Sequence, residues 1–255
     1  MTPVLETNSL SKYFGGVKAI NNFSINIEEK QIYGLIGPNG AGKTTIFNTI
    51  TGIYRPTNGS IKFEGKEISN LMPYQIAALG IGRTFQNIRL FSKLSVVDNV
   101  YIASQGSATY GLFEAVTHVG RFKQTEKKVK ENSYQLLELL GLADEANKQA
   151  GSLPYAYQRR LEIARCMALN PKLILLDEPA AGTNPKESRE LIDFIKETHE
   201  KFNLTILMIE HHMDVVMNLC QLITVLNFGE VICQGTSEEI KNNPCVIDAY
   251  LGKEE

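Results

Sequence analysis

Apolar runs of strand length recur along this chain, and segments with helical periodicity lie between them. The apolar runs are residues 31–36, 173–176, 204–209 and 222–226. Runs of this kind are typical of strands buried on both faces of a parallel sheet. A helix is expected from Pro185, because Asn184 can cap its first turn and Glu187 can complete the capping box. Strands that alternate with helices predict a largely parallel α/β sheet.

Two segments depart from this alternation. Residues 5–27 indicate β structure, and residues 59–65 have the pattern of a hairpin arm. Residues 95–151 carry long helical patterns, interrupted by a loop near residues 106–120. We therefore expect a parallel-sheet core with an antiparallel β arm and an inserted helical subdomain. The predicted domains are the core, residues 1–94 with 152–255, and the helical subdomain, residues 95–151.

The composition narrows the class of protein. The chain has 255 residues, 43% of them hydrophobic, and a formal net charge of −2. No basic excess indicates a nucleic-acid surface, so no nucleic-acid partner is expected. The cysteines are far apart and form no Cys-x-x-Cys pair, which favours reduced thiols over a disulfide frame or a metal site. No signal-peptide pattern or run of about 20 apolar residues is visible, so any role at a membrane is expected to depend on a partner.

Residues 37–44 match the pattern Gly-x-x-x-x-Gly-Lys-Ser/Thr in full. The matching residues are Gly37, Pro38, Asn39, Gly40, Ala41, Gly42, Lys43 and Thr44. Glycines allow backbone N–H groups to approach phosphate oxygens, and the helix expected over residues 44–51 presents its positive end to them. Lys43 can reach the β- and γ-phosphates, and the Thr44 hydroxyl can ligate Mg²⁺. The segment therefore predicts a nucleoside-triphosphate site.

Polar residues follow two of the predicted strands. Asp177 can hold Mg²⁺ through water, and Glu178 is placed to polarise an attacking water as a general base. Paired acids at a strand end can also form a solvated turn, but the phosphate loop in the same chain favours the catalytic interpretation. His211 can contact a γ-phosphate from the end of the 204–209 run. His212 is a rival, and spacing alone does not choose between them.

Together these segments resemble the ATP-binding-cassette (ABC) ATPases over nearly the whole chain. The segments that carry the resemblance are residues 37–45, Thr84-Phe85-Gln86, residues 153–160, residues 173–178 and His211. The resemblance implies a P-loop (RecA-like) core, ATP hydrolysis, and ATP and Mg²⁺ as ligands, with Thr45 part of the phosphate loop. It makes Gln86 the Q-loop residue that contacts Mg²⁺ and senses a membrane partner, and it makes His211 the switch histidine.

Two further positions follow from the resemblance. Phe14 lies where the family stacks an aromatic ring on adenine, and Tyr13 is its close competitor. Either ring could instead be a packed strand aromatic. Asn184 occupies the D-loop position, where many members carry aspartate.

Family members dimerise head to tail, and each ATP lies between one chain's phosphate loop and the other chain's signature segment. Here the signature segment is residues 153–158, at the boundary of the helical subdomain, so Leu153, Tyr155 and Ala156 are expected to contact the partner's nucleotide. The family pattern is Leu-Ser-Gly-Gly-Gln, and this chain lacks the serine. Ala156 stands where glycine is usual, so its methyl group is expected to crowd that nucleotide.

Within the family, the chain is similar to the ATP-binding subunits of branched-chain amino-acid importers. The similar segments are residues 82–91, 159–165, 177–185, 209–211 and 243–252. In that branch, Pro154 and Tyr155 after the signature leucine are familiar, and the loop over residues 106–121 fits a longer insertion. The branch implies a peripheral protein on the cytoplasmic face of the cell membrane. The branch also implies partners for this chain. These are transmembrane permease subunits and a second cassette, which is either a different ATP-binding subunit or a second copy of this chain. An external solute-binding protein is an indirect partner.

The same residues bear on other functions. A lipopolysaccharide-export ATPase shares much of the motif set but lacks the ending over residues 243–252, whereas a urea or short-amide importer ATPase is a closer alternative. Soluble ABC ATPases of DNA repair or ribosomes carry two cassettes in one chain or long coiled-coil arms, and this chain has neither. A regulator that binds ATP without hydrolysing it is disfavoured by Glu178 and His211 together. The sequence does not specify the solute, because the ATPase does not contact it.

Overall fold

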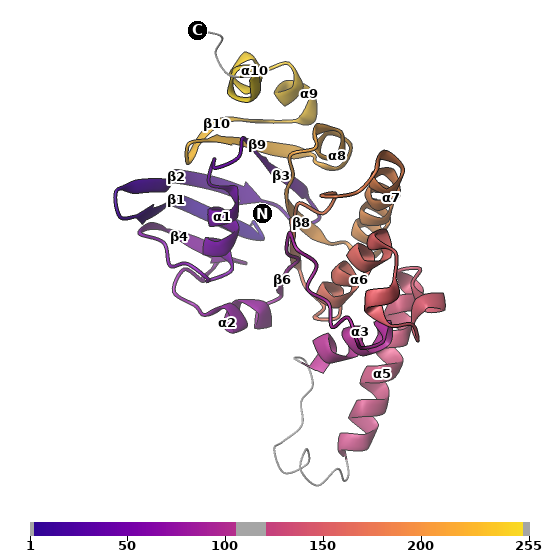
Figure 1. Cartoon of the computed structure of the whole chain (residues 1–255). Helices are drawn as coiled ribbons and strands as arrows, with labels where there is room; N and C mark the ends of the chain where they lie inside the picture. Colours follow the sequence, from indigo (N-terminus) through magenta and orange to yellow (C-terminus); the bar gives the residue numbers. More distant parts are fainter. Residues whose placement is uncertain (1–2, 106–120, 252–255) are drawn as a thin grey trace. The chain divides into compact units, whose positions relative to one another are not determined.

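The computed structural model describes residues 3–105 and 121–251 (Figure 1). The predicted loop near residues 106–120 lies outside the described residues. The chain divides into two compact units, Met1–Gln86 with Lys172–Glu255, and Asn87–Pro171. The domain boundaries expected from the sequence, at residues 95 and 151, fall inside the second unit.

A six-stranded sheet forms the centre of the first unit. Its strands, in spatial order, are β10 (Glu230–Gly235), β9 (Leu222–Asn227), β3 (Ile32–Ile36), β8 (Thr205–Ile209), β7 (Leu173–Asp177) and β6 (Ile81–Arg83). All neighbouring strands are parallel except β9 and β10. Every residue of β3, β7 and β8 is buried, which is the burial that continuous apolar runs predict. The four predicted strands of this sheet are thereby confirmed.

Parallel pairing brings the ends of three strands to one edge of this sheet. Asp177 at the end of β7 pairs with Ile209 of β8, and Ile209 pairs with Leu35 of β3. Strands that pair in parallel have their carboxyl ends on the same edge. The segments that follow β3, β7 and β8 therefore start close together, and they contain most of the predicted catalytic residues.

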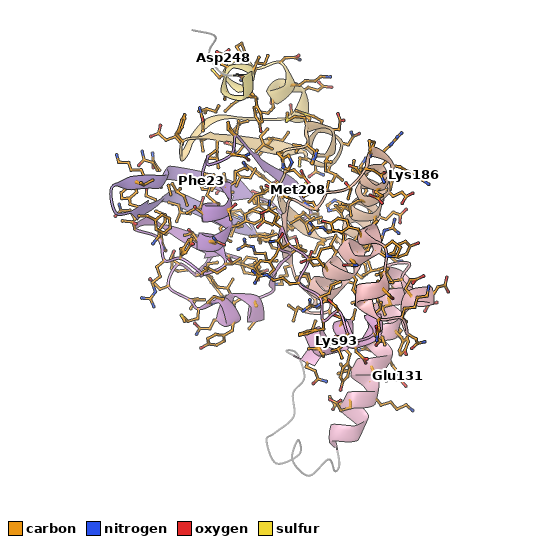
Figure 2. All side chains as sticks on the ribbon, in the orientation of Figure 1. Phe23, Lys93, Glu131, Lys186, Met208 and Asp248 are labelled. Atoms are coloured by element: carbon orange, nitrogen blue, oxygen red, sulfur yellow. The ribbon has the colours of Figure 1, made fainter. Side chains whose placement is uncertain are left out.

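The predicted antiparallel arm is a second sheet in the same unit. Its strands, in spatial order, are β2 (Val17–Ile27), β1 (Leu5–Phe14), β4 (Asn58–Phe63) and β5 (Lys66–Glu67). Its apolar face and one face of the large sheet contribute to a single hydrophobic core, which includes Phe23 and Phe47. Phe23 and Met208, both labelled in Figure 2, are fully buried. Together the two sheets confirm the predicted α/β class.

The helices of the first unit begin at recognisable sequence signals. They are α1 (Lys43–Ile50), α2 (Pro73–Ala78), α7 (Pro185–Phe202), α8 (Met213–Leu219), α9 (Ser237–Lys241) and α10 (Pro244–Leu251). At α7, Asn184 Oδ1 accepts hydrogen bonds from the N–H groups of Lys186 (2.9 Å) and Glu187 (3.0 Å). The Glu187 carboxylate accepts the Asn184 N–H at 3.0 Å in return. The predicted capping box at this helix is confirmed.

The second unit is helical, as its sequence pattern predicts. It contains α3 (Val96–Ser104), α5 (Arg121–Leu139), the short 3₁₀ helices η2 (Ala143–Glu145) and η3 (Ala150–Ser152), and α6 (Tyr155–Met167). The three α-helices pack against one another. Buried Asn99 joins α3 to the preceding loop, through hydrogen bonds with both the N–H (2.9 Å) and the carbonyl (3.1 Å) of Phe91. Across the described parts of both units, none of the helices combines the length and apolar character that a membrane span requires.

Candidate functional site

The phosphate loop joins β3 to α1, and two of its glycines cannot be replaced without strain. Gly37 and Gly42 have φ values of 149° and 103°. A Cβ at Gly37 would lie 2.2 Å from the carbonyl oxygen of Leu226, and one at Gly42 would lie 2.4 Å from that of Ala19. Only glycine fits such positions. Because α1 begins at Lys43, its N-terminal N–H groups and positive end form part of the loop.

The side chain of Lys43 folds back over this loop. Its Nζ donates hydrogen bonds to the carbonyl oxygens of Gly37 at 2.6 Å and Pro38 at 2.9 Å. Burial lowers the pKa of Lys43, and the charges of Glu178 and Asp177 partly oppose this by raising it. A phosphate oxygen forms stronger, charge-assisted hydrogen bonds with an ammonium group than a neutral carbonyl does. The Lys43 ammonium is therefore placed to exchange loop carbonyls for a phosphate.

A hollow of about 360 Å³ lies over the loop, and it includes Glu178 in its lining. The loop residues that line it are Asn39, Gly40, Ala41, Gly42, Lys43, Thr44 and Thr45. Val17 and Phe228 also line it, although they are 65% and 85% exposed. No sequence motif marks these two side chains, which give the hollow an apolar rim.

The predicted adenine-stacking residues are absent from the described lining of this hollow. Phe14 instead packs edge-on against Tyr54, with ring centroids 5.2 Å apart. The Tyr13 hydroxyl donates a hydrogen bond to Asn21 Oδ1 at 3.0 Å. Adenine contact therefore stays a prediction for both rings.

Asp177 is buried at the end of β7, and Arg83 is its charged partner. Arg83 Nη2 donates to Asp177 Oδ2 at 2.9 Å. The other terminal nitrogen, Nη1, donates to Asn48 Oδ1 (2.8 Å) and Thr51 Oγ1 (3.1 Å), both at the end of α1. Arg83 thus joins β6, β7 and α1 around the predicted metal carboxylate. Arg83 was not predicted from the sequence, although a charged residue just before the Thr84-Phe85-Gln86 motif is a signal for it.

Glu178 lies close to the two other predicted catalytic residues, Gln86 and His211. Its Oε2 accepts a hydrogen bond from Gln86 Nε2 at 2.8 Å and lies 3.7 Å from His211 Nδ1. The Glu178 backbone has φ 48°, in the left-handed region that non-glycine residues rarely adopt. Strain of this kind persists where the surroundings hold it and is concentrated at functional sites. The arrangement can hold a carboxylate and an imidazole over the same phosphate.

The structure separates the two neighbouring histidines by their partners. His211 faces Glu178, whereas His212 Nδ1 lies 3.2 Å from Glu210 Oε2. The two rings are stacked at an angle, with centroids 4.2 Å apart. This geometry places His211, rather than His212, beside Glu178, and it pairs His212 with Glu210.

The predicted metal ligands offer the chemistry that Mg²⁺ prefers. Thr44 is exposed and supplies a hydroxyl to the lining of the hollow, and Asp177 supplies a carboxylate whose Oδ2 accepts from Arg83. Mg²⁺ favours such hard oxygen ligands and retains several waters. The donor set therefore fits the ion, while Gln86 makes its hydrogen bond to Glu178.

The signature segment forms the start of α6 in the second unit. Pro154 is the N-cap and Tyr155 the first helical residue, so the helix presents its N-terminal N–H groups at this segment. Arg159 orients Tyr155, donating to its hydroxyl from Nη2 at 2.8 Å. Ala156 is partly exposed, whereas the Leu153 side chain is only 4% exposed. Leu153 therefore packs within its own unit, and Tyr155 and Ala156 are the more accessible of the three predicted contacts.

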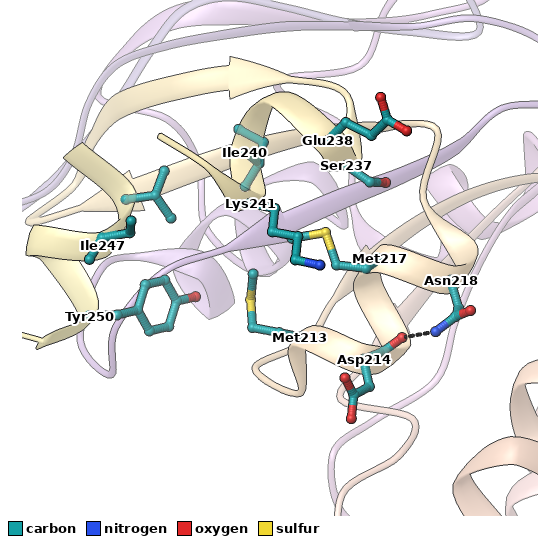
Figure 3. A pocket seen from close by; sticks show the side chains of 11 residues that line it. Met213, Asp214, Met217, Asn218, Ser237, Glu238, Ile240, Lys241, Ile247 and Tyr250 are labelled. Atoms are coloured by element: carbon teal, nitrogen blue, oxygen red, sulfur yellow. Dashed lines mark hydrogen bonds between the residues drawn. The ribbon is translucent and has the colours of Figure 1, made fainter. Parts of the chain in front are cut away.

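A larger hollow, of about 670 Å³, lies between α8, α9 and α10 (Figure 3). Figure 3 shows the Lys241 side chain between Met217 and Tyr250. Burial raises the pKa of Tyr250, and a hydrogen bond to the backbone of Gly37 opposes the shift.

Comparisons with known proteins agree with this geometry. The family model described as "ABC transporter" matches residues 20–181, and that of the "Branched-chain amino acid ATP-binding cassette transporter" matches residues 230–255. The chain is 46% identical to the "High-affinity branched-chain amino acid transport ATP-binding protein LivG" of Salmonella typhimurium, over 98% of each chain. It is 44% identical, again over 98% of each, to the protein of the same description named BraF from Pseudomonas aeruginosa.

Solved structures give the same result. A crystal structure of an ATP-binding cassette of an ABC transporter in its ADP conformation matches with a TM-score of 0.86 and 30% identity. The match covers 99% of this chain and 100% of that one. A nucleotide-free cassette matches with a TM-score of 0.85 and 32% identity, over 99% and 100% of the two chains.

Replacing Arg83 by methionine is expected to reduce the free energy of unfolding by about 3 kcal/mol, because it leaves the Asp177 carboxylate buried without its cation. Urea denaturation of the purified chain measures the change. Lys186→Met is the control: Lys186 belongs to an exposed ion pair with Glu190 and its removal is expected to have no measurable effect. Equal losses in the two variants would contradict a supporting role for Arg83.

Proposed function

Because this chain belongs to the ABC transporter family and is a transporter ATPase, we propose that it powers the uptake of branched-chain amino acids. The single observation that carries this proposal is the full-length similarity to LivG and BraF, proteins named for that transport. The match of residues 230–255 to the branched-chain family model supports it with residues outside the match to the general family model. Neither a urea importer nor a lipopolysaccharide exporter receives comparable support.

The roles proposed for the site residues follow from their positions. Lys43 and the N–H groups of the loop bind the β- and γ-phosphates, and Glu178 aligns and deprotonates the attacking water. His211, which lies 3.7 Å from the same carboxylate, contacts the γ-phosphate. Binding and positioning account for most of the barrier lowering in phosphoryl transfer, so small displacements of these groups are costly.

Thr44 and Asp177 are the proposed ligands of Mg²⁺, with Gln86 as a further contact. When bound, Mg²⁺ supplies positive charge to the phosphate oxygens. In this structure the Gln86 amide donates to Glu178. The same side chain can therefore contact either Glu178 or the proposed Mg²⁺. A Q-loop that reports on a membrane subunit therefore has a direct contact with the proposed general base.

The assembly we propose has two cassettes beneath transmembrane permease subunits, with an external solute-binding protein delivering the solute. The partner cassette is a second ATP-binding subunit or a second copy of this chain. Its signature residues, equivalent to Tyr155 and Ala156 here, complete each ATP site. The chain then lies at the cytoplasmic face of the membrane as a peripheral subunit. ATP binding closes the pair, because ATP interacts more favourably with the closed than with the open arrangement.

Glu178→Gln is expected to reduce ATP turnover by at least about a hundredfold, because the amide cannot accept the proton of the attacking water. ATP affinity is expected to remain, since the phosphate loop is unchanged. Phosphate release and the binding of a fluorescent ATP analogue measure the two properties separately. Lys43→Ala is the complementary variant, and it is expected to lose nucleotide binding itself. An unchanged rate in Glu178→Gln would exclude this residue as the general base.

Ala156→Gly is expected to raise the ATP turnover of the cassette pair, because it removes a methyl group from the helix start that meets the partner's nucleotide. The matched control is Ala168→Gly at the C-cap of the same helix, which is expected to give no gain. Steady-state ATPase assays of both variants, in the complex with the membrane subunits, measure the difference. Equal rates for Ala156→Gly and the unchanged chain would show that the alanine does not hinder the site.

Proteoliposomes that contain the full chain, with the membrane subunits and solute-binding protein that copurify with it, are expected to accumulate leucine when ATP is enclosed. The same vesicles carrying Glu178→Gln provide the control without hydrolysis. Radiolabelled leucine and urea, compared in parallel, test the solute class. ATP-dependent uptake of urea without uptake of leucine, isoleucine or valine would overturn the branched-chain assignment while leaving the ATPase assignment intact.

A further inference from the structure

Glu210 is an acid with no assigned role, and it is completely buried directly behind the proposed catalytic residues. Its exposed fraction is 0%, and it follows β8 immediately before His211. Its Oε1 accepts a hydrogen bond from the N–H of Ala180 at 2.8 Å. Its Oε2 accepts hydrogen bonds from the N–H groups of His211 at 3.0 Å and His212 at 3.3 Å. One carboxylate thus binds two separate loops.

The two carboxylate oxygens of Glu210 accept hydrogen bonds from different loops. Oε1 serves the loop that follows Glu178, whereas Oε2 serves the loop that carries His211. His212 Nδ1 also lies 3.2 Å from Oε2 and can donate a further hydrogen bond in the suitable tautomer. Buried carboxylates are costly unless several donors satisfy them. Glu210 meets this requirement with backbone N–H groups, which side-chain motion cannot withdraw.

The main chain reinforces the same connection. The N–H of Glu178 donates to the carbonyl of Ile209 at 2.9 Å, one residue before Glu210. The segment of residues 178–180 is therefore hydrogen-bonded to residues 209–210 at both of its ends, through the N–H groups of Glu178 and Ala180. Glu178 and His211 approach to 3.7 Å between these attachments. Their separation depends on the geometry of both loops.

We infer that Glu210 is a positioning residue for ATP hydrolysis, which couples the loop after Glu178 to the loop of His211 so that the two side chains move as one unit. This inference rests on the proposed function, because it assumes that Glu178 and His211 act on the same phosphate. Ala180 lies between Glu178 and the D-loop position Asn184. A displacement of the D-loop is therefore transmitted through Glu210 to the backbone of His211.

A metal ion offers a different explanation for this cluster, because ligand atoms of Glu210, His211 and His212 lie within 4.8 Å of one another. The backbone contacts argue against it. Each Glu210 oxygen already accepts an N–H group at 3.0 Å or less, and these donors lie in the loops themselves. The pKa of buried Cys220 is raised to about 12, mainly by burial and to a smaller extent by the negative charge of Glu210.

Glu210→Gln is the informative substitution, because it keeps size and shape while changing one acceptor into a donor. The amide oxygen can serve one loop, but the NH₂ group then faces the N–H groups of the other loop and cannot accept from them. One of the two loops is released. A positioning role predicts that kcat for ATP falls about ten- to a hundredfold, because misplacement of about 1 Å has effects of that size. The KM for ATP is expected to change little, since the phosphate loop is untouched.

The matched control is Thr7→Val in the antiparallel arm. The Thr7 hydroxyl is also buried, and it accepts a hydrogen bond from the N–H of Ile25 at 3.0 Å. This variant removes a buried hydrogen bond without entering the site, so it is expected to lower thermal stability and leave kcat unchanged. If Glu210→Gln and Thr7→Val lose similar thermal stability but only Glu210→Gln loses kcat, the result supports a positioning role.

A double-mutant cycle in the purified full chain then tests whether Glu210 acts through His211. If it does, Glu210→Gln has little further effect on kcat once His211 is alanine, because effects of residues that act as a unit are not additive. Additive losses overturn the inference. So does a Glu210→Gln chain that hydrolyses ATP at the original rate, or one that loses ATP binding and turnover in proportion.

Glu178→Gln in the same assays separates this inference from the proposed function. If Glu178→Gln keeps its turnover, the assignment of the general base fails, and the coupling of Glu210 to it fails too. If Glu178→Gln is inactive while Glu210→Gln is fully active, the proposed function stands and only the positioning role is removed.

Discussion

The parallel pairing of β3, β8 and β7 is the constraint on which the site depends. Backbone hydrogen bonds fix the register Leu35 to Ile209 to Asp177, and every strand residue concerned is buried. Three loops must therefore leave the sheet at one edge, and they carry the N–H groups proposed to bind phosphate, the acids Glu178 and Glu210, and two histidines. A sheet of this kind determines where the loops start, but not how their side chains are oriented. Buried polar groups behind the loops orient these side chains.

Three residues with positive φ lie at the same edge. Glu178 has a left-handed backbone, and Gly37 and Gly42 have positive φ values beside main-chain oxygens. Lys43 and Gln86 meanwhile form hydrogen bonds with protein groups, Lys43 with loop carbonyls and Gln86 with Glu178. A triphosphate offers better acceptors to the Lys43 ammonium. In the proposed function, nucleotide binding is therefore an exchange of internal contacts for contacts with the nucleotide.

The sequence predicts this backbone well, because apolar runs, glycines and helix caps act locally. Strands over residues 173–176 and 204–209 and the Asn184 cap are examples. It fails for β6, which has only three residues and no visible alternation, and for β10, which is mostly exposed. It also misses contacts between distant residues: Arg83 and Asp177 are 94 positions apart, and no local pattern pairs them. Phe14 shows the converse, since its motif position did not reveal its packing on Tyr54.

Two buried carboxylates at this edge are stabilised in different ways, and the difference indicates what each can do. Arg83 Nη2 donates to Asp177 Oδ2, and Nη1 donates to Asn48 and Thr51. A carboxylate has about four lone-pair sites, so a contact of this kind orients Asp177 and leaves capacity for a cation. Glu210 instead uses both oxygens on N–H groups of two loops. Its acceptor capacity serves the protein itself, which suits a residue that holds catalytic groups in place rather than one that binds a ligand.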